Sequence, residues 1–389
     1  MQILYLTHHF TPDIIAGALR AYRNSNMLAE FGHNLNIITS ASGNSLVDEK
    51  LFPLHSNCNV QRVSGFHIPY FPDGYGYVKN FVNAGKVLAE NSDVIFATSP
   101  TISTGIAGYK ISQKTSKPFV IEMRDPWLRS TGVKKLQRGG AHINVNSVQG
   151  RLFFSIQKKL LAGAKKIVVT NAEIIREIRI LHPELNENTF EVVYNSVGDI
   201  KKSKGVKFSR PTIFCSGVLY KERGIDVLIK SMQYNADVQL LLAGFAPDED
   251  MRYYEKLIYD LNLIDRVQFL GVIPPEDVIK YQLGADILFA GQTDPKLNYN
   301  LPARVFEYMA VGKPVLALAI RNSGLDNLIT LHKCGEVTYS NDPVDLARSI
   351  GNLSNKTTAL ALGRAGKRAV KTTFNLRTQT KKLEHALFN

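Results

Sequence analysis

Two cations lie in a glycine-flanked turn in the second half of the chain, where they could bind phosphate. Lys221 and Arg223 follow a short apolar run, with Gly217 before them and Gly224 after them. Glycines let the backbone approach a phosphate closely, and nearby cationic side chains can hold its charge. On these residues alone, a solvated loop is the preferred interpretation of the Lys-Glu-Arg turn.

A carboxylate and another cation lie at the start of a predicted helix. Glu307 comes just after the helix N-terminus and follows a polar loop, so its carboxylate could accept both hydroxyls of a ribose. Arg304, one turn earlier, is expected to face the same side. A glutamate at a helix start is also an ordinary partner of the helix dipole. Taken alone, that second interpretation is preferred.

A third group of polar residues ends an apolar run in the first half of the chain. Glu122, Arg124, Asp125 and Trp127 lie in the segment KPFVIEMRDPW. Charges are costly inside a parallel strand, so Glu122 and Arg124 should face a wet cleft or pair with each other. An arginine cannot act as a base near neutral pH. Arg124 is therefore assigned to acceptor or phosphate binding and Asp125 to acid/base chemistry, with a buried ion pair as the competing interpretation.

Two series of apolar strands alternating with helical patterns must position these residues. Such continuous apolar runs are typical of parallel sheets covered on both faces. His8 and His9 follow the first run, and for both of them packing and hydrogen bonding is the preferred interpretation. A polar, lysine-rich linker at 200–210 separates the series. The predicted strands are 2–6, 35–39, 94–98, 119–123, 166–170 and 190–194, then 212–217, 238–244, 267–271, 286–291 and 315–319.

This pattern predicts an α/β protein with two Rossmann-like domains facing a central cleft. We expect an N-terminal domain over 1–200, a second domain over 207–373, and a final helix over 374–389. Ligands in such folds bind at the carboxyl ends of the strands. The pattern by itself fits a sugar transferase, a periplasmic binding protein or a two-domain dehydrogenase.

Composition narrows the class of protein. The chain has 389 residues, 44% of them hydrophobic and 21% charged, as in ordinary globular proteins. Its three scattered cysteines favour a reducing compartment and argue against a structural zinc site. The N-terminus reads as a buried strand, and no apolar run reaches the roughly 20 residues of a spanning helix. We therefore expect a cytoplasmic protein, possibly peripheral on the inner face of the membrane.

The net charge of +13 is concentrated in one segment. Residues 129–166 contain no Asp or Glu, and a helical pattern over 150–162 places an apolar stripe beside Lys158 and Lys159. Such a segment could lie on anionic lipid, or could be the solvated face of a core helix. Nucleic acid is not expected as a partner, because no binding motif is present. The basic residues are Arg129, Lys134, Lys135, Arg138, Arg151, Lys158, Lys159, Lys165 and Lys166.

Four sequence blocks follow one another along the chain: PDIIAG (12–17) with LAEFGHNLNIIT (28–39), KPFVIEMRDPW (117–127), CSGVLYKERGIDVLIKSM (215–232) and NLPARVFEYMAVGKPVLAL (300–318). Together they resemble the family-4 retaining glycosyltransferases of the GT-B type, especially members acting on lipid-linked acceptors in surface polysaccharide assembly. The resemblance covers nearly the whole chain. It implies that the domain over 1–200 binds the acceptor, that the domain over 207–373 binds the nucleotide sugar, and that the helix over 374–389 packs back on the first domain.

The resemblance implies a donor site made of Gly17, Gly217, Lys221, Arg223, Val272, Asn300, Arg304 and Glu307. Arg223 takes the place of the phosphate-binding lysine, whereas the family's other cation falls at the apolar Val218, for which Lys221 could substitute. The backbone near Val272 would contact the nucleobase. The sugar-binding glutamate falls at Tyr299, so Asn298 and Asn300 or the backbone would replace it.

The activity implied is metal-independent, retaining transfer of a sugar from a nucleoside diphosphate sugar, with UDP as the expected nucleotide, to a glycan or lipid-linked acceptor. No cofactor and no metal are expected. Asp125 and Arg124 are the catalytic candidates. Trp127, Arg129, Lys134, Lys135, Lys158 and Lys159 are expected on an acceptor or membrane face. The alternatives are a nucleotide-sugar epimerase-like protein and a catalytically impaired sugar-nucleotide-binding subunit.

Overall fold

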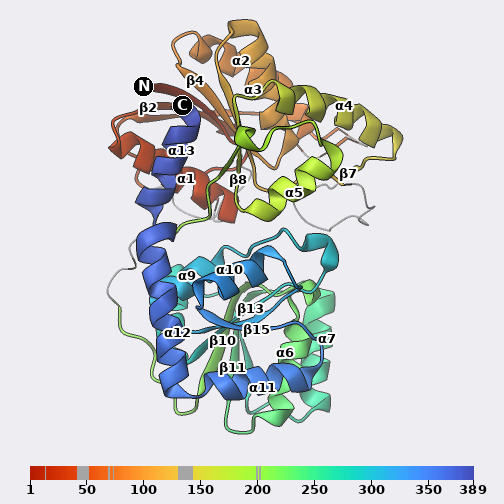
Figure 1. Ribbon diagram of the computed structural model, residues 1–389, viewed down its shortest axis with the longest axis vertical. Helices are drawn as coiled ribbons and strands as arrows, with labels where there is room; N and C mark the ends of the chain where they lie inside the picture. The colour runs from red at the N-terminus through yellow and green to blue at the C-terminus, as the bar shows by residue number, and fades with distance from the viewer. Residues whose placement is uncertain are drawn as a thin grey trace. The chain divides into compact units, whose positions relative to one another are not determined.

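The chain forms two compact units, each built on a parallel sheet covered by helices on both faces (Figure 1). The computed structural model describes residues 1–13, 15–41, 52–68, 71–72, 74–129, 143–198, 200 and 203–389, without the side chains of residues 129 and 143. Unit 1 contains Met1–Asn195 and Leu376–Asn389, and unit 2 contains Ser196–Asn375. The chain therefore leaves unit 1 slightly before the predicted linker and returns to it at the start of the last helix.

Unit 1 has a seven-stranded parallel sheet in the order β3-β2-β1-β4-β5-β8-β9. The central strands are fully buried because helices cover both faces, which is why their sequences are continuous apolar runs. The strands are β1 (Gln2–Leu6), β2 (Asn34–Ser40), β3 (Cys58–Val63), β4 (Val94–Ser99), β5 (Phe119–Met123), β8 (Lys166–Val169) and β9 (Phe190–Val192), with a separate pair β6 (Leu128–Arg129) and β7 (Ile143–Asn144). The helices are α1 (Ala16–Glu30), α2 (Val78–Ala89), α3 (Ile102–Thr115), α4 (Val148–Ala162) and α5 (Ala172–Leu181).

The last helix of the chain, α13 (Leu376–Phe388), packs on unit 1, as predicted. Leu383 and Leu387 are fully buried in the unit 1 core beside Leu28 of α1. His33 holds the end of the helix, because its Nε2 lies 2.7 Å from Glu384 Oε1 and its ring stacks on Phe388 at 5.0 Å. Helix α1 ends at Glu30, and Gly32, two residues later, has a left-handed φ of 90° that suits the end of a helix.

Unit 2 has a six-stranded parallel sheet in the order β12-β11-β10-β13-β14-β15. Figure 1 shows α6 and α7 on one side of this sheet and α9 and α12 on the other. The strands are β10 (Thr212–Val218), β11 (Gln239–Phe245), β12 (Val267–Gly271), β13 (Ile287–Gly291), β14 (Val315–Leu318) and β15 (Gly335–Thr338). The helices are α6 (Ile225–Ser231), α7 (Asp248–Asp260), α8 (Pro275–Gly284), α9 (Arg304–Val311), α10 (Gly324–His332), α11 (Pro343–Leu353) and α12 (Lys356–Ala369).

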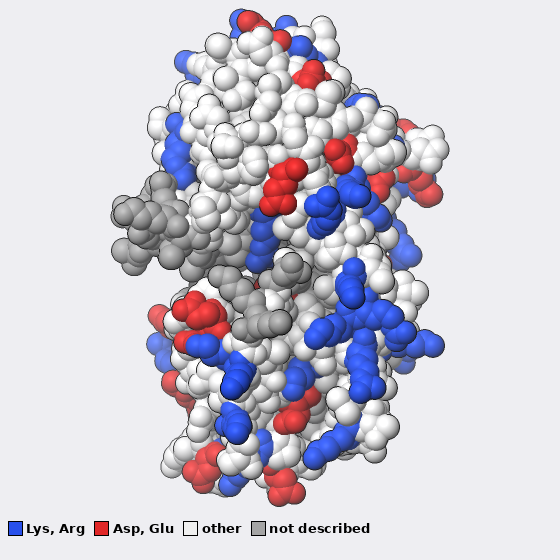
Figure 2. Space-filling view, turned by 90° about the vertical axis from the view of Figure 1, so that its left-hand side faces the viewer, with Lys and Arg blue, Asp and Glu red and all other residues white. Residues whose placement is uncertain are grey.

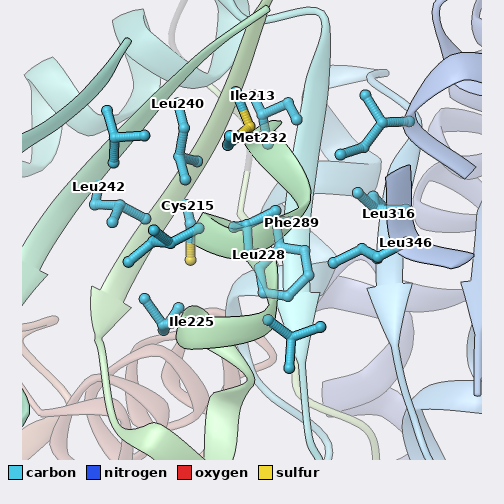
Figure 3. Packing of buried hydrophobic residues seen from close by; sticks show 14 of the residues in the cluster. Ile213, Cys215, Ile225, Leu228, Met232, Leu240, Leu242, Phe289, Leu316 and Leu346 are labelled. Atoms are coloured by element: carbon cyan, nitrogen blue, oxygen red, sulfur yellow. The ribbon is translucent and has the colours of Figure 1, made fainter. Parts of the chain in front are cut away.

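A fully buried apolar cluster holds the strands of unit 2 against α6 and α11 (Figure 3). Cys215 of β10 lies in this cluster, and burial raises the pKa of its thiol, so it is a packing residue. Along the described part of the linker, the Val206 amide donates to the Lys280 carbonyl at 3.0 Å, so this segment is fixed to α8 although it has no regular structure.

The surface of unit 2 is basic over one helix. Figure 2 looks at the side of the molecule where α12 lies and shows Lys and Arg gathered in its lower half. Arg364, Lys367 and Arg368 of α12 are all exposed, and the helix contains no Asp or Glu. Among the described residues, no helix is long and apolar enough to cross a membrane.

Unit 1 depends on a buried ion pair, and removing one partner should be costly. Arg20 and Glu122 are both buried and pair at 2.7 Å, so Arg20→Met would leave the Glu122 carboxylate without its main counter-charge. We expect a loss of about 3–5 kcal/mol in the free energy of unfolding of unit 1. Urea denaturation followed by fluorescence of Trp127, the single tryptophan and a buried residue of unit 1, measures this loss.

The control for this experiment is Arg179→Met, which breaks the exposed ion pair with Glu187 in the same unit. An exposed pair contributes about 1 kcal/mol or less, so this variant should unfold close to the wild type. Equal losses in the two variants would contradict the role assigned to Arg20.

Candidate functional site

Three neighbouring strands of unit 2 end in glycines that have left-handed backbone conformations. Gly217 and Gly244 are the last but one residues of β10 and β11, with φ of 107° and 132°, and Gly271 ends β12 with φ of 65°. A Cβ at Gly244 would overlap the Gly217 carbonyl oxygen, and one at Gly217 would lie 3.4 Å from the Arg304 guanidinium. The glycines thus leave the backbone of this sheet edge open beside a cation.

Arg304, the first residue of α9, lies against the end of β10. Its guanidinium donates to the carbonyl of Ser216 and, at 3.4 Å, to the carbonyl of Val218. Tyr308, one turn later in α9, accepts a hydrogen bond from the Ser216 amide at 3.1 Å. These hydrogen bonds fix helix α9 to β10. The partners of Arg304 in them are neutral, so they do not cancel its charge.

Arg223 is a second guanidinium at the same edge, in the turn that follows β10. Both of its terminal nitrogens lie 3.5 Å from Asn300 Oδ1. The amide of Gln292, oriented to satisfy both neighbours, accepts from Arg223 Nη1 at 3.2 Å and donates to the Glu222 carbonyl at 3.1 Å. Burial, together with the neighbouring charge of Arg304, lowers the pKa of Arg223 to about 10, so the residue stays charged at neutral pH.

Neither Arg223 nor Arg304 forms an ion pair with a carboxylate in the part of the chain that the structure describes. The ion pairs seen there in unit 2 involve other residues, on α6, α7, α8 and α11. Two neighbouring cations held only by neutral acceptors repel each other, and an anion placed between them would remove that repulsion. The arrangement suits a diphosphate, whose charge grows when a bond to it breaks.

The structure distributes the other predicted donor-site residues around these two cations. Glu307 lies in the first turn of α9, half-buried, and accepts from Gln282 Nε2 of α8 at 3.5 Å. Val272 follows β12 and is 75% exposed. Lys221 is exposed and lies over the Tyr253 ring at 5.0 Å, on the α7 side of the turn. Gly224 has φ of 66° and begins α6.

Tyr299 stands where the resemblance places the sugar-binding glutamate. It is 1% exposed, so it belongs to the packed interior of unit 2. Its neighbour Asn300 contacts Arg223, as described, and the Asn298 carbonyl accepts from the Gly324 amide at 3.0 Å. Asn300 is therefore the residue of this loop that the structure places beside a cation.

In unit 1, Glu122 does not pair mainly with Arg124, which was one of the two predicted arrangements. Its main partner is Arg20 of α1, which also donates to the carbonyls of Val193 and Tyr194. Arg124 lies 4.0 Å from the second carboxylate oxygen and donates to the carbonyls of Ser99 and Pro100. Because Arg20 supplies the counter-charge, Glu122 does not depend on Arg124.

Arg124 lies with a glycine and a histidine at the carboxyl edge of the unit 1 sheet. A Cβ at Gly17 would overlap the Arg124 guanidinium, so only glycine allows this approach. His9 lies with Nδ1 3.7 Å from Asp13, and burial lowers its pKa, opposed by Asp13 and assisted by Arg124. Asp125 is half-buried beside Arg124 in sequence. Arg124 and Gly17 are thus in contact, as expected for two residues of one site.

Trp127 is not on an exposed face. It is 3% exposed, its indole N–H donates to the Ser99 hydroxyl, and a Cβ at Gly105 of α3 would lie 2.8 Å from its ring. The prediction that Trp127 lies on an acceptor or membrane face is wrong, because the loop after β5 places the large apolar ring of Trp127 inside unit 1.

The basic helix α4 is partly a core helix. Phe153, Leu160 and Leu161 of this helix are fully buried in unit 1. Lys158 and Lys159 are exposed, and Lys158 lies 3.7 Å from Glu184. Arg129 belongs to β6, its side chain is outside the description, and Lys134 and Lys135 lie outside the described residues.

Sequence reasoning missed Gln292 and Arg20. Gln292 directly follows an apolar strand, and a buried glutamine has no pattern that marks it before the fold is known. Arg20 lies in a helix, and nothing in the sequence around it marks it as buried, although a buried glutamate requires a cation. In the described part of the chain, no group of three or more His, Cys, Asp or Glu could hold a metal ion.

His8 should make unit 1 less stable in acid. Burial, assisted by His9, lowers the pKa of His8 to about 3, whereas an unfolded histidine titrates near 6.5. Between these two values the unfolded state binds more protons, so stability falls as the pH falls from about 6.5. His8→Gln should flatten this part of the pH curve of the urea midpoint, read from Trp127 fluorescence. Parallel curves for the two proteins would contradict the assignment.

Comparison with known proteins agrees with this geometry. Residues 196–369 match the family described as Glycosyl transferases group 1. The chain is 22% identical over 361 residues to an uncharacterized glycosyltransferase, MJ1607, of Methanocaldococcus jannaschii, covering 89% of this chain and 87% of the relative. It is 21% identical over 374 residues to the alpha-monoglucosyldiacylglycerol synthase of Streptococcus pneumoniae, covering 90% and 77%.

Among solved structures, Anabaena Alr3699/HepE in complex with UDP is similar, with a TM-score of 0.73, 17% identity, and coverage of 100% of this chain and 99% of that one. This likeness supports the fold predicted from the sequence. The chain therefore has the GT-B fold of two Rossmann-like units, and its residues 196–369 are similar to the group 1 glycosyl transferases.

Proposed function

We propose that this protein is a metal-independent, retaining glycosyltransferase that takes a sugar from a nucleoside diphosphate sugar, with UDP as the nucleotide. The observation that carries the proposal is the pair Arg223 and Arg304, held near each other by neutral acceptors at the carboxyl edge of the unit 2 sheet. A leaving diphosphate gains negative charge as the bond to the sugar breaks. Two preformed cations stabilise that charge and supply what a metal ion supplies in other enzymes.

Glu307 completes the proposed donor site. Its carboxylate lies in the first turn of α9, three residues after Arg304, so ribose hydroxyls and the diphosphate would be bound by the same turn. UDP is the favoured nucleotide because a protein of the same fold, Alr3699/HepE, was solved in complex with it. In unit 1, Arg124 with Gly17 would contact the transferred sugar or its phosphate, and Asp125 would act as acid or base.

The proposed acceptor is a glycan or lipid-linked molecule at a membrane surface. The name of the relative from S. pneumoniae, a glucosyldiacylglycerol synthase, points to a lipid acceptor for that protein. In this chain, the exposed face of α4 combines Val148 at 87% and Leu152 at 52% exposure with Arg151, Lys158 and Lys159. Apolar side chains beside basic ones suit the interface of an anionic bilayer.

A nucleotide panel tests the donor site. We expect UDP to raise the thermal midpoint of the wild type more than GDP, ADP or TDP, and to do so equally in EDTA, because binding to the native state alone must stabilise it. Glu307→Ala and Arg223→Met should lose the UDP shift. Arg223→Met should also keep or raise the ligand-free midpoint, since it removes the repulsion with Arg304.

The matched control is Lys256→Met, which removes an exposed cation of α7 from the same unit. It should leave the UDP shift unchanged. If no nucleotide stabilises the wild type at millimolar concentration, the proposed function is wrong. A UDP shift without any sugar transfer would indicate a nucleotide-binding subunit without turnover.

Vesicle binding tests the membrane face. Each basic residue near an anionic bilayer contributes about 1 kcal/mol, so Lys158→Gln with Lys159→Gln should weaken partition to phosphatidylserine-containing vesicles about 30-fold. Cosedimentation measures the partition, and zwitterionic vesicles give the background. Arg364→Gln with Lys367→Gln on α12 removes the same charge elsewhere. Equal weakening in both double variants would show general charge attraction and would contradict a specific role for α4.

A further inference from the structure

Three exposed apolar side chains lie at the carboxyl ends of three neighbouring strands of unit 2. They are Val218 at the end of β10, 37% exposed, Phe245 at the end of β11, 45% exposed, and Val272 directly after β12, 75% exposed. Single exposed apolar residues are common on protein surfaces, but neighbouring ones form a patch that marks a binding surface. We call these three residues the apolar shelf.

The shelf residues are neighbours because of the strand register. Val218 pairs with Phe245 across β10 and β11, and the Leu219 amide donates to the Phe245 carbonyl at 2.8 Å. Ala243 pairs with Gly271, so Val272 is level with Gly244 and lies on the opposite side of β11 from Val218. Neighbouring strands lie about 4.8 Å apart, so the three ends span roughly 10 Å. That width fits a single planar ring system with Phe245 at its centre.

The same local sequence produces all three members of the shelf. Each apolar residue directly follows a glycine with a left-handed φ, in the pairs Gly217–Val218, Gly244–Phe245 and Gly271–Val272. A glycine in this conformation interrupts the regular alternation of side chains along a strand. The apolar residue after it is therefore free to lie at the open edge of the sheet instead of in the core.

The shelf begins at the cation site. The Val218 carbonyl is one of the acceptors of the Arg304 guanidinium, at 3.4 Å, and Gly217 lies directly beside that guanidinium. A ligand that covers the shelf and reaches the cations must join a flat, apolar-faced ring to a negatively charged group. A nucleotide has this chemistry, with the base on the shelf and the diphosphate at Arg223 and Arg304.

We propose that Phe245 is the platform on which the nucleobase of the donor stacks, with Val218 and Val272 on either side. This inference rests on the proposed function and adds the residue that binds the base. Stacking on an aromatic ring depends little on which base is present. The shelf therefore supplies affinity for the nucleoside, whereas the choice among bases falls to polar groups at the strand ends.

Calorimetric titration of UDP and of inorganic pyrophosphate separates the base from the phosphates. Phe245→Ala should weaken UDP binding about 10-fold and leave pyrophosphate binding unchanged. Tyr234→Ala removes another exposed aromatic ring of unit 2, 58% exposed and before the start of β11, and should change neither. Equal weakening of both ligands by Phe245→Ala, or no weakening of UDP, would overturn the inference.

A second variant reads the contact directly. Phe245→Trp keeps an aromatic platform, so UDP should bind within a few-fold of the wild type, and the new indole should be quenched by UDP but not by pyrophosphate. Wild-type Trp127 is buried in unit 1 and gives the background signal. If UDP binds without quenching the new indole, the base lies elsewhere and the inference is wrong.

Two outcomes distinguish this inference from the proposed function. A wild type that binds neither UDP nor any other nucleotide overturns both. If the wild type binds UDP and the Phe245→Ala variant binds it equally well, only the stacking role is overturned. If Phe245→Ala instead loses binding to phospholipid vesicles while its UDP affinity is unchanged, the shelf contacts lipid and the nucleobase assignment is wrong.

Discussion

The repulsion between Arg223 and Arg304 is the constraint on which the candidate site depends. Two guanidiniums beside each other in a half-buried position are unfavourable unless something fixes them, because each is partly removed from water and each opposes the other. Here the fixing groups are neutral. Arg304 is held by carbonyls at the end of β10, and Arg223 by the amide oxygens of Gln292 and Asn300. The charge is positioned but kept available for an anion.

In unit 1, by contrast, the buried charge of Glu122 is neutralised by a side chain of opposite charge. Glu122 is buried near the carboxyl end of β5, and Arg20 neutralises it with two hydrogen bonds while also binding backbone carbonyls. That pair is satisfied internally and is part of the architecture. Because Arg20 has this task, Arg124 on the same strand end is left with carbonyl partners and with Gly17 beside it. Arg124 therefore remains the proposed ligand-binding arginine of unit 1.

The sequence predicted the buried strands well because helices on both faces force them to be continuously apolar. Strands at the edges of a sheet are partly exposed, so their sequences need not be continuously apolar. β3, with alternating exposed and buried residues, and β15, a short partly exposed strand, were both missed. Single residues were predicted less well where the chain path decides burial. Trp127 was assigned to an acceptor or membrane face together with the basic residues that follow it, but it is buried because its large ring packs against Gly105 of α3.

The contrast between Gln292 and Phe245 shows what a sequence can reveal about a site. Gln292 acts through contacts with Arg223 and with the turn after β10, which only the fold brings to β13. Phe245 could have been found earlier, since Gly-Val, Gly-Phe and Gly-Val recur at three successive strand ends. A single glycine at the end of a buried strand, followed by an apolar residue, is common and indicates no binding site. Three such pairs on adjacent strands place three apolar side chains along one sheet edge, and the adjacent cations make that edge suitable for a nucleotide.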